Sequence, residues 1–328
     1  MVIIDVITRF RLSVIASITS SPFIYQHSNP TSQMDSLYQH FIDFDLSLND
    51  RPSLFHENHF GAEISRTLLD QVCRLVKSSD PKLFATWTRG LYRETSKTNP
   101  DKTLILAVYS HSRYYKYGRV YSIFTTMERQ LRYLLFHETH VELDAANFVP
   151  ETLHQITQKL RPALKCPELT RFVENRDITY ARVAALGLDA DPKTFVLKLL
   201  NQRECAVFPP HALFLRKLQR ELLKIKSIFN EVNPHIAVNP EKGRKPETVL
   251  CRWIDTLEVT LLEILVEHLQ TNKFAQNCVL IHDGLLIQKD SKLCLQKISD
   301  IVFQETGFRY TYKLKQLKPN CNSLYYLN

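Results

Sequence analysis

The stretch NCVLIHDGLLIQKD (277–290) contains two apolar, strand-like runs on either side of Asp283-Gly284. Asp-Gly is a favoured pair for a tight hairpin turn, so this stretch predicts two antiparallel strands with an aspartate at the turn. A second strand-like run, VELDAANFVPE (141–151), ends near Asp144. Both aspartates lie in apolar, strand-like runs, where a carboxylate is costly unless it binds a cation or accepts hydrogen bonds.

The pattern of apolar residues predicts the elements around these two strands. We expect, in chain order, a helical region at 34–96, strands at 102–109 and 141–144, a helix at 150–160, helices through 167–232, a helix at 249–269, the hairpin, a helix at 293–304 capped by Gly307, and a strand at 309–315. Asp191-Pro192 is a typical helix start within the helical stretch. This order predicts an α+β fold: an antiparallel sheet backed by helices, with a helical insertion.

Composition and charge describe a basic globular protein. The 328 residues are 44% hydrophobic and 23% charged, with a formal net charge of +8. A basic excess favours a polyanionic partner, although a solvated basic surface has the same composition. The seven cysteines are scattered and form no CxxC pair, which indicates a reducing, intracellular compartment without a disulfide framework. No apolar run is long enough for a membrane span, so we expect no membrane partner.

Three regions are expected along the chain. Residues 1–33 are an N-terminal extension whose serines and arginines are compatible with a targeting segment, or with a dispensable leader before Met34. Residues 34–117 form a helical, thumb-like region, and residues 118–328 hold the sheet, with the helical insertion at about 151–245.

Asp144 and Asp283 are the candidate catalytic and metal-binding residues. Phosphoryl transfer by two metal ions needs carboxylates that hold the ions about 3.5–4 Å apart, and strand ends and tight turns hold such groups rigidly. The expected cofactor is Mg²⁺ or Mn²⁺. The alternative for each aspartate alone is an ordinary turn residue.

Candidate nucleic-acid-binding residues come mainly from the tract YSHSRYYKYGRVY (109–121), which interleaves tyrosines with basic residues. Aromatic rings that stack on bases beside cations that bind phosphates are typical of single-strand contacts. Exposed strands also contain such tyrosines, so a structural role stays open. The candidates are Arg113, Tyr115, Lys116 and Arg119, together with Arg129, Arg132 and His282 further along the chain.

A basic helical face is a further candidate for phosphate contacts. Residues 215–229 place Leu215, Leu218, Leu222, Ile225 and Phe229 on one side of a helix and Arg216, Lys217, Arg220, Lys224 and Lys226 on the other. Lys193 and Lys198 lie on the helix that starts at Pro192, where a lysine facing the metal ions would bind a triphosphate. As isolated residues, such lysines are more often solvated.

Six segments together resemble the palm and fingers of family A DNA polymerases and phage-type single-subunit RNA polymerases, and most of all the transposon–virus polymerase family. They are GRVYS (118–122), RQLRYLL (129–135), VELDAANFVPETL (141–153), PKTFVLKLLN (192–201), VLIHDGLLI (279–287) and TGFRYTYKLK (306–315). The resemblance implies a template-directed nucleotidyltransferase, of DNA-directed DNA polymerase or primase type. It matches Asp144 and Asp283 to the two metal aspartates, and His282 to the histidine before the second.

The resemblance also implies nucleotide binding by Lys193, with Lys198 and Arg182 assigned to the same task. Its expected partners are a DNA or RNA template with primer, nucleoside triphosphates, and a helicase of the same virus-like mobile element. Three positions depart from the large DNA polymerases: Gly284 replaces a second acid, Val149 replaces the glutamate that selects deoxynucleotides, and the fingers helix ends at Asn201 instead of Tyr-Gly. The choice between DNA and RNA products therefore stays open.

Two alternatives are left open. The first is a ribonuclease-H-like two-metal nuclease or transposase that uses Asp144, Asp283 and a downstream acid such as Glu305, and its sheet would contain parallel strands. The second is a catalytically inactive relative that only binds nucleic acid.

Overall fold

The computed structural model describes most of the chain after residue 58. The described residues are 59–79, 81–95, 99–111, 120–188, 191–201, 208, 212–233, 246–271, 278–281, 284–289 and 293–319. They all belong to one compact unit, residues 41–328.

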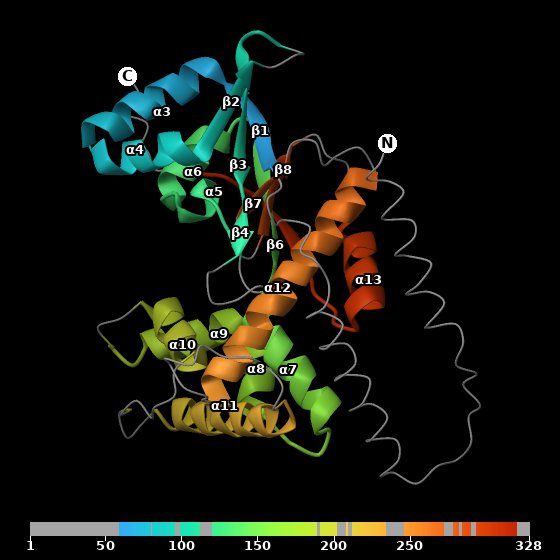
Figure 1. The fold of residues 1–328 in the computed structure, drawn as a ribbon. Helices are drawn as coiled ribbons and strands as arrows, with labels where there is room; N and C mark the ends of the chain where they lie inside the picture. The colour runs from blue at the N-terminus through green and yellow to red at the C-terminus, as the bar shows by residue number, and fades with distance from the viewer. Residues whose placement is uncertain are drawn as a thin grey trace, which may run out of the picture. The chain divides into compact units, whose positions relative to one another are not determined.

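Helices and short antiparallel strands make up this unit (Figure 1). The strands are β1 (His59–Ser65), β2 (Leu91–Thr95), β3 (Lys102–Val108), β4 (Ser110–His111), β5 (Val120–Tyr121), β6 (His140–Ala145), β7 (Val279–Ile281), β8 (Gly284–Gln288) and β9 (Tyr312–Gln316). The helices are α3 (Arg66–Ser79), α4 (Pro81–Gly90), α5 (Ile123–Thr126), α6 (Arg129–Phe136), α7 (Phe148–Leu160), α8 (Pro167–Glu174), α9 (Arg176–Ala184), α10 (Pro192–Asn201), α11 (Leu213–Val232), α12 (Pro246–Thr271) and α13 (Leu295–Thr306).

The described strands form three sheets, and all their pairings are antiparallel. The four-stranded sheet has the order β7-β8-β6-β9, so the strand of Asp144 lies between the second strand of the hairpin and the last strand of the chain. The other two sheets have the orders β1-β3-β2 and β4-β5. The expected α+β class, with antiparallel sheets and helices, is confirmed.

The helix α12 is the central packing element of this unit. It is buried almost all round between Val249 and Val266, as expected for a helix with apolar residues on every side. Figure 1 shows α12 running from the α11 end of the helical group to the four-stranded sheet, with α13 beside it; contacts with α11 and α13 agree. The core therefore joins the sheet to the helices that lie between β6 and β7 in the chain.

Several expected elements occur where the sequence placed them. The helix α10 begins at Pro192, and the Asp191 carboxylate accepts a hydrogen bond from Thr194 N at 2.8 Å, as an N-cap does. Gly307 ends α13 with φ 69°, a left-handed conformation that glycine adopts easily. The predicted apolar side of α11 is buried along its whole length.

Two expectations were wrong. The region 59–95 is not purely helical, because β1 and β2 flank α3 and α4 and pair with β3. Ile64, inside the region expected to be helical, lies in β1. On α11, Lys226 is 2% exposed and belongs to the core rather than to the basic face.

A fully buried tyrosine connects two of the sheets. Tyr109, which follows β3, donates from its hydroxyl to Leu280 O at 3.2 Å and accepts from Leu280 N at 3.1 Å. Leu280 is in β7, the first strand of the hairpin. The end of the N-terminal sheet is therefore bonded to the outer strand of the four-stranded sheet, three residues before Asp283.

Candidate active site

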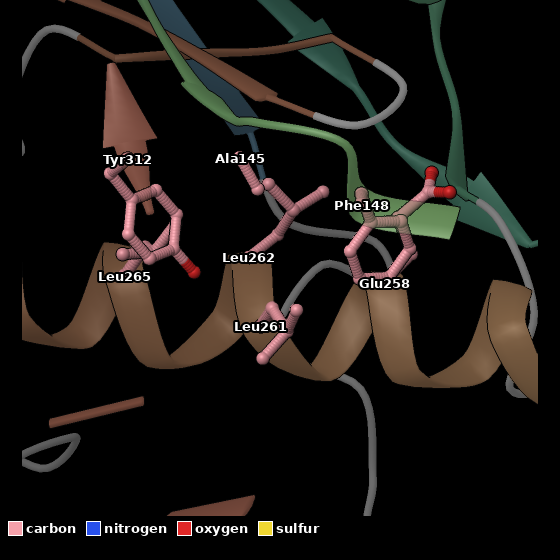
Figure 2. A pocket seen from close by; sticks show the side chains of 7 residues that line it. All are labelled: Ala145, Phe148, Glu258, Leu261, Leu262, Leu265 and Tyr312. Carbon is pink, nitrogen blue, oxygen red and sulfur yellow. The ribbon is translucent and has the colours of Figure 1, made fainter. Parts of the chain in front are cut away.

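The two faces of β6 are chemically different. Because side chains alternate along a strand, Glu142 and Asp144 share one face, and Val141, Leu143 and Ala145 share the other. The apolar face packs on α12: Figure 2 shows Ala145 and Tyr312 above Leu262 and Leu265, in a small pocket that also includes Phe148, Glu258 and Leu261. The helix α12 therefore fixes β6 from behind and leaves the acidic face on the opposite side.

The register of the sheet brings Asp144 to the hairpin. Asp144 pairs with Gly284 of β8, and Gly284 pairs with Ile281 of β7. The residues between this last pair in the sequence are His282 and Asp283, both outside the described residues. We had expected Asp283-Gly284 as the turn pair, but Gly284 already belongs to β8.

A cation from β9 occupies the acidic face. Lys315 lies opposite Glu142 in the register, and its ammonium donates a hydrogen bond to Asp144 Oδ2 and lies 3.5 Å from Glu142 Oε1. The Glu142 and Asp144 side chains are only 12% and 13% exposed, whereas Lys315 is 46% exposed. Burial lowers the pKa of Lys315, but the bond to Asp144 and the charges of both acids outweigh burial and raise it.

The helix α6 holds Glu142 from another direction. Tyr133 donates a hydrogen bond to Glu142 Oε2 at 2.9 Å, and the guanidinium of Arg129 lies 4.9 Å from the centre of the Tyr133 ring. Arg129 has a raised pKa, first because of Tyr133 and then because of the charges of Glu142 and Asp144. Arg129 is exposed near Glu142 and Asp144, so nucleic acid can reach its side chain as predicted.

Arg132 does not share this exposure. It is 8% exposed, and its guanidinium donates to the carbonyl oxygens of Phe124 at 2.9 Å and Met127 at 3.2 Å. These bonds join α6 to α5 and the residue after it. We therefore assign Arg132 a structural role instead of the expected phosphate contact.

The predicted nucleotide-binding residues lie in the helical group α7–α11. Lys193 and Lys198 are both exposed on α10. Arg182 of α9 already has two partners: its guanidinium lies 3.9 Å from the Phe214 ring and 3.9 Å from Glu168 Oε2. Among the described residues, no recorded hydrogen bond or ion pair joins Lys193, Lys198 or Arg182 to Asp144.

One contact does link this helical group to the end of β6. Arg176, the first residue of α9, donates to Asn147 Oδ1 at 2.9 Å. Asn147 follows β6 by two residues and has φ 55°, a left-handed conformation that asparagine tolerates better than most residues. The chain therefore turns sharply after Asp144, and α9 holds that turn.

The remaining predicted nucleic-acid contacts, Arg113, Tyr115, Lys116 and Arg119, lie outside the described residues. Sequence reasoning missed Glu142, Tyr133 and Lys315. Glu142 could have been identified from the sequence, because residues two positions apart in a strand share a face and Glu142 is two positions before Asp144. Lys315 could not, because only the register of β6 with β9 brings it to the acids.

No protein-family model matches the sequence, and comparison with curated proteins finds no significant match. Within the described ranges, no group of three or more His, Cys, Asp or Glu side chains is arranged to hold a metal ion. The helices that the structure describes include none with the length and apolar character needed to cross a membrane.

Proposed function

We propose that the chain is a template-directed nucleic-acid polymerase in which Asp144 and Asp283 bind the catalytic metal ions. One observation carries the proposal: the register pairs Asp144 with Gly284, the residue covalently next to Asp283. The end of β6 and the start of β8, far apart in the sequence, are thus side by side in the sheet. Such rigid backbone is what a two-metal site needs.

The described carboxylates suit a hard divalent cation. Glu142 and Asp144 present oxygen atoms on one face and already share one cation, the Lys315 ammonium. Magnesium prefers carboxylate oxygens combined with substrate phosphates. When bound, Mg²⁺ would activate the attacking hydroxyl and neutralise the triphosphate. The protein's own part is to hold the carboxylates, and in this proposal β6, β8 and α12 do so.

The helices α7–α11 would then be the fingers, and the four-stranded sheet the palm. Lys193 of α10 is the proposed triphosphate contact, and exposed Arg129 beside the acids is a proposed contact for template or primer. The product, DNA or RNA, is not specified by these residues.

Sheet topology supports the polymerase over the ribonuclease-H-like nuclease. The nuclease reading needs parallel strands, whereas all pairings between described strands are antiparallel. Its candidate third acid, Glu305, is an exposed residue of α13. We therefore prefer nucleotide incorporation to phosphodiester cleavage as the reaction of this site.

Primer extension tests the proposal. The wild type should extend a labelled primer on a template with Mg²⁺ and nucleoside triphosphates, while Asp144→Asn and Asp283→Asn should lose at least about a thousandfold in rate, since each removes metal-bound charge that stabilises the transition state. Asp101→Asn is the matched control, because Asp101 is an exposed loop residue.

Three results would contradict the proposal. Incorporation that survives in Asp144→Asn would remove the metal assignment. Cleavage of the template without incorporation would favour the nuclease. Template binding by a wild type that incorporates nothing would identify the inactive relative.

A further inference from the structure

The cation at the acidic face comes from the protein itself. Lys315 lies on β9, the outer strand next to β6, and bonds Asp144 while it also approaches Glu142. Two carboxylates that are mostly buried on one strand face repel each other, and this is costly unless a cation compensates them. Lys315 supplies that compensation.

We propose that Lys315 is an internal counter-ion that a divalent cation must displace from Asp144 and Glu142 before the site can function. The inference rests on the proposed function, because it assumes that Asp144 binds the metal. It adds two residues to that site: Glu142 as a second carboxylate of the β6 face, and Lys315 as the group that sets how tightly the metal binds.

The exposures indicate which partner moves. The acids lie on an inner strand and are about one-eighth exposed, whereas the lysine is nearly half exposed on an outer strand. Glu142 is also held at its other oxygen by Tyr133. A flexible lysine side chain can therefore turn into solvent while the carboxylates keep their positions. The exchange replaces one positive charge with two and requires no movement of the backbone.

This arrangement makes two predictions about metal binding that do not involve catalysis. Removal of the lysine charge should raise the affinity for a divalent cation, because the metal ion then no longer has to displace an ammonium group from the carboxylates. It should also make the fold more dependent on the ion, because the two mostly buried carboxylates then lose a cation that lies within 4 Å of both.

The experiment measures Mn²⁺ binding to the full chain by electron paramagnetic resonance, with no nucleotide or nucleic acid. Lys315→Met should bind Mn²⁺ about tenfold more tightly than the wild type, a difference that corresponds to about 1.4 kcal/mol. Lys315→Arg should stay close to the wild type because it keeps the charge. Lys318→Met, which removes an exposed lysine three residues later, is the charge-matched control. Asp144→Asn should lose the site.

Thermal unfolding with EDTA and with Mn²⁺ provides a second readout. In EDTA, the melting temperature of Lys315→Met should be below that of the wild type. Addition of Mn²⁺ should raise the melting temperature of Lys315→Met more than that of the wild type. This pattern also separates loss of the counter-ion from simple misfolding, which Mn²⁺ would not repair.

Equal Mn²⁺ affinity in Lys315→Met and Lys318→Met would overturn the inference, and so would weaker binding in Lys315→Met. If binding is unchanged in Lys315→Met but lost in Asp144→Asn, the inference fails while the metal site of the proposed function stands. If neither the wild type nor Lys315→Met binds Mn²⁺, both fail.

Discussion

At the scale of single residues, Gly284 determines how closely two strands approach at Asp144. A Cβ atom at position 284 would lie 2.7 Å from the carbonyl oxygen of Leu143, a separation that real side chains do not tolerate against backbone. The absence of a side chain therefore lets β8 pair with β6 at its end. This gives a structural reason why glycine, rather than a residue with a side chain, stands at position 284.

Gly284→Ala should separate β8 from β6 next to Asp144. We expect a loss of about 1–3 kcal/mol in the free energy of unfolding, as for other overpacked sites, measured by urea denaturation. Mn²⁺ binding should weaken as well, because the candidate ligand Asp144 is the residue that pairs with Gly284. Gly187→Ala is the comparison: Gly187 has φ 64° but no atom within 4 Å of a new Cβ, so it tests backbone strain alone. A Gly284→Ala protein that matches the wild type in both measurements would show that the strands can adjust.

At the scale of elements, α10 presents two exposed lysines in different directions. Lys193 and Lys198 are five residues apart, so at 3.6 residues per turn they point about 140° away from each other. A cleft on one side of α10 can therefore receive only one of them. The N-cap at Asp191 fixes the start of the helix and so fixes which face Lys193 occupies.

Lys193→Ala should raise the KM for nucleotide about tenfold or more and slow incorporation, because a charge-assisted contact with the triphosphate is lost. Steady-state primer extension at varied nucleotide concentration measures this, and template affinity should change little. Lys198→Ala is the matched control on the same helix. If Lys198→Ala raises the KM and Lys193→Ala does not, Lys198 is the triphosphate contact. If both variants resemble the wild type, α10 is not a nucleotide-binding helix.

Elements with strong local signals were predicted well from the sequence, and those that depend on distant pairing were not. The N-cap of α10, the buried side of α11 and Gly307 at the end of α13 follow from residues within a few positions of each other. The strands β1 and β2 were missed because they form by pairing with β3, and their neighbours α3 and α4 extend a helical pattern.

The same distinction applies to the candidate site. Asp144 was identifiable from its own strand, whereas the bond between Lys315 and Asp144 depends on a register between residues 171 positions apart. Lys226 and Arg132 were predicted to be on the surface because they are basic, but neighbouring helices bury them. Charge alone does not indicate whether a side chain faces solvent or a backbone carbonyl.

At the scale of the whole compact unit, Tyr109 couples the N-terminal sheet to the hairpin strand β7. Its hydroxyl bonds both backbone groups of Leu280, which lies on the outer strand of the four-stranded sheet. Burial raises the pKa of Tyr109 well above its ordinary value, so the hydroxyl keeps its proton and remains both donor and acceptor. The position of β7 is therefore linked to a sheet formed from a distant part of the chain.

Tyr109→Phe should leave the buried Leu280 groups without this partner and cost about 1–3 kcal/mol in the free energy of unfolding. Hydrogen exchange should show faster exchange at Leu280 and its hairpin neighbours than at α11, which is remote from this bond. Tyr121→Phe is the control, because Tyr121 is 40% exposed. Equal exchange at Leu280 in Tyr109→Phe and the wild type would mean that the hydroxyl does not hold the strand.

The basic excess of the whole molecule predicts salt-dependent binding to nucleic acid. The exposed residues Lys217, Arg220 and Lys224 of α11 are the candidates for phosphate contacts. Replacing all three with glutamine should reduce the slope of log affinity against log salt by roughly 2 to 3, because each phosphate contact releases counterions. Fluorescence anisotropy at several salt concentrations measures the slope. A control triple variant at exposed Lys289, Lys297 and Lys318 removes the same charge elsewhere on the protein. An equal decrease of the slope in this control would show that net charge, rather than the face of α11, determines the binding.

The position of β9 in its sheet also affects how the protein self-associates. It is an outer strand of its sheet, and its side chains from Lys313 to Gln316 are exposed. Outer strands can template the addition of strands from other molecules, and lysines along them discourage such stacking through repulsion between like charges. Exposed Lys313 on β9 therefore opposes self-aggregation at high protein concentration, whereas the charge of Lys315 is balanced by Asp144 and Glu142.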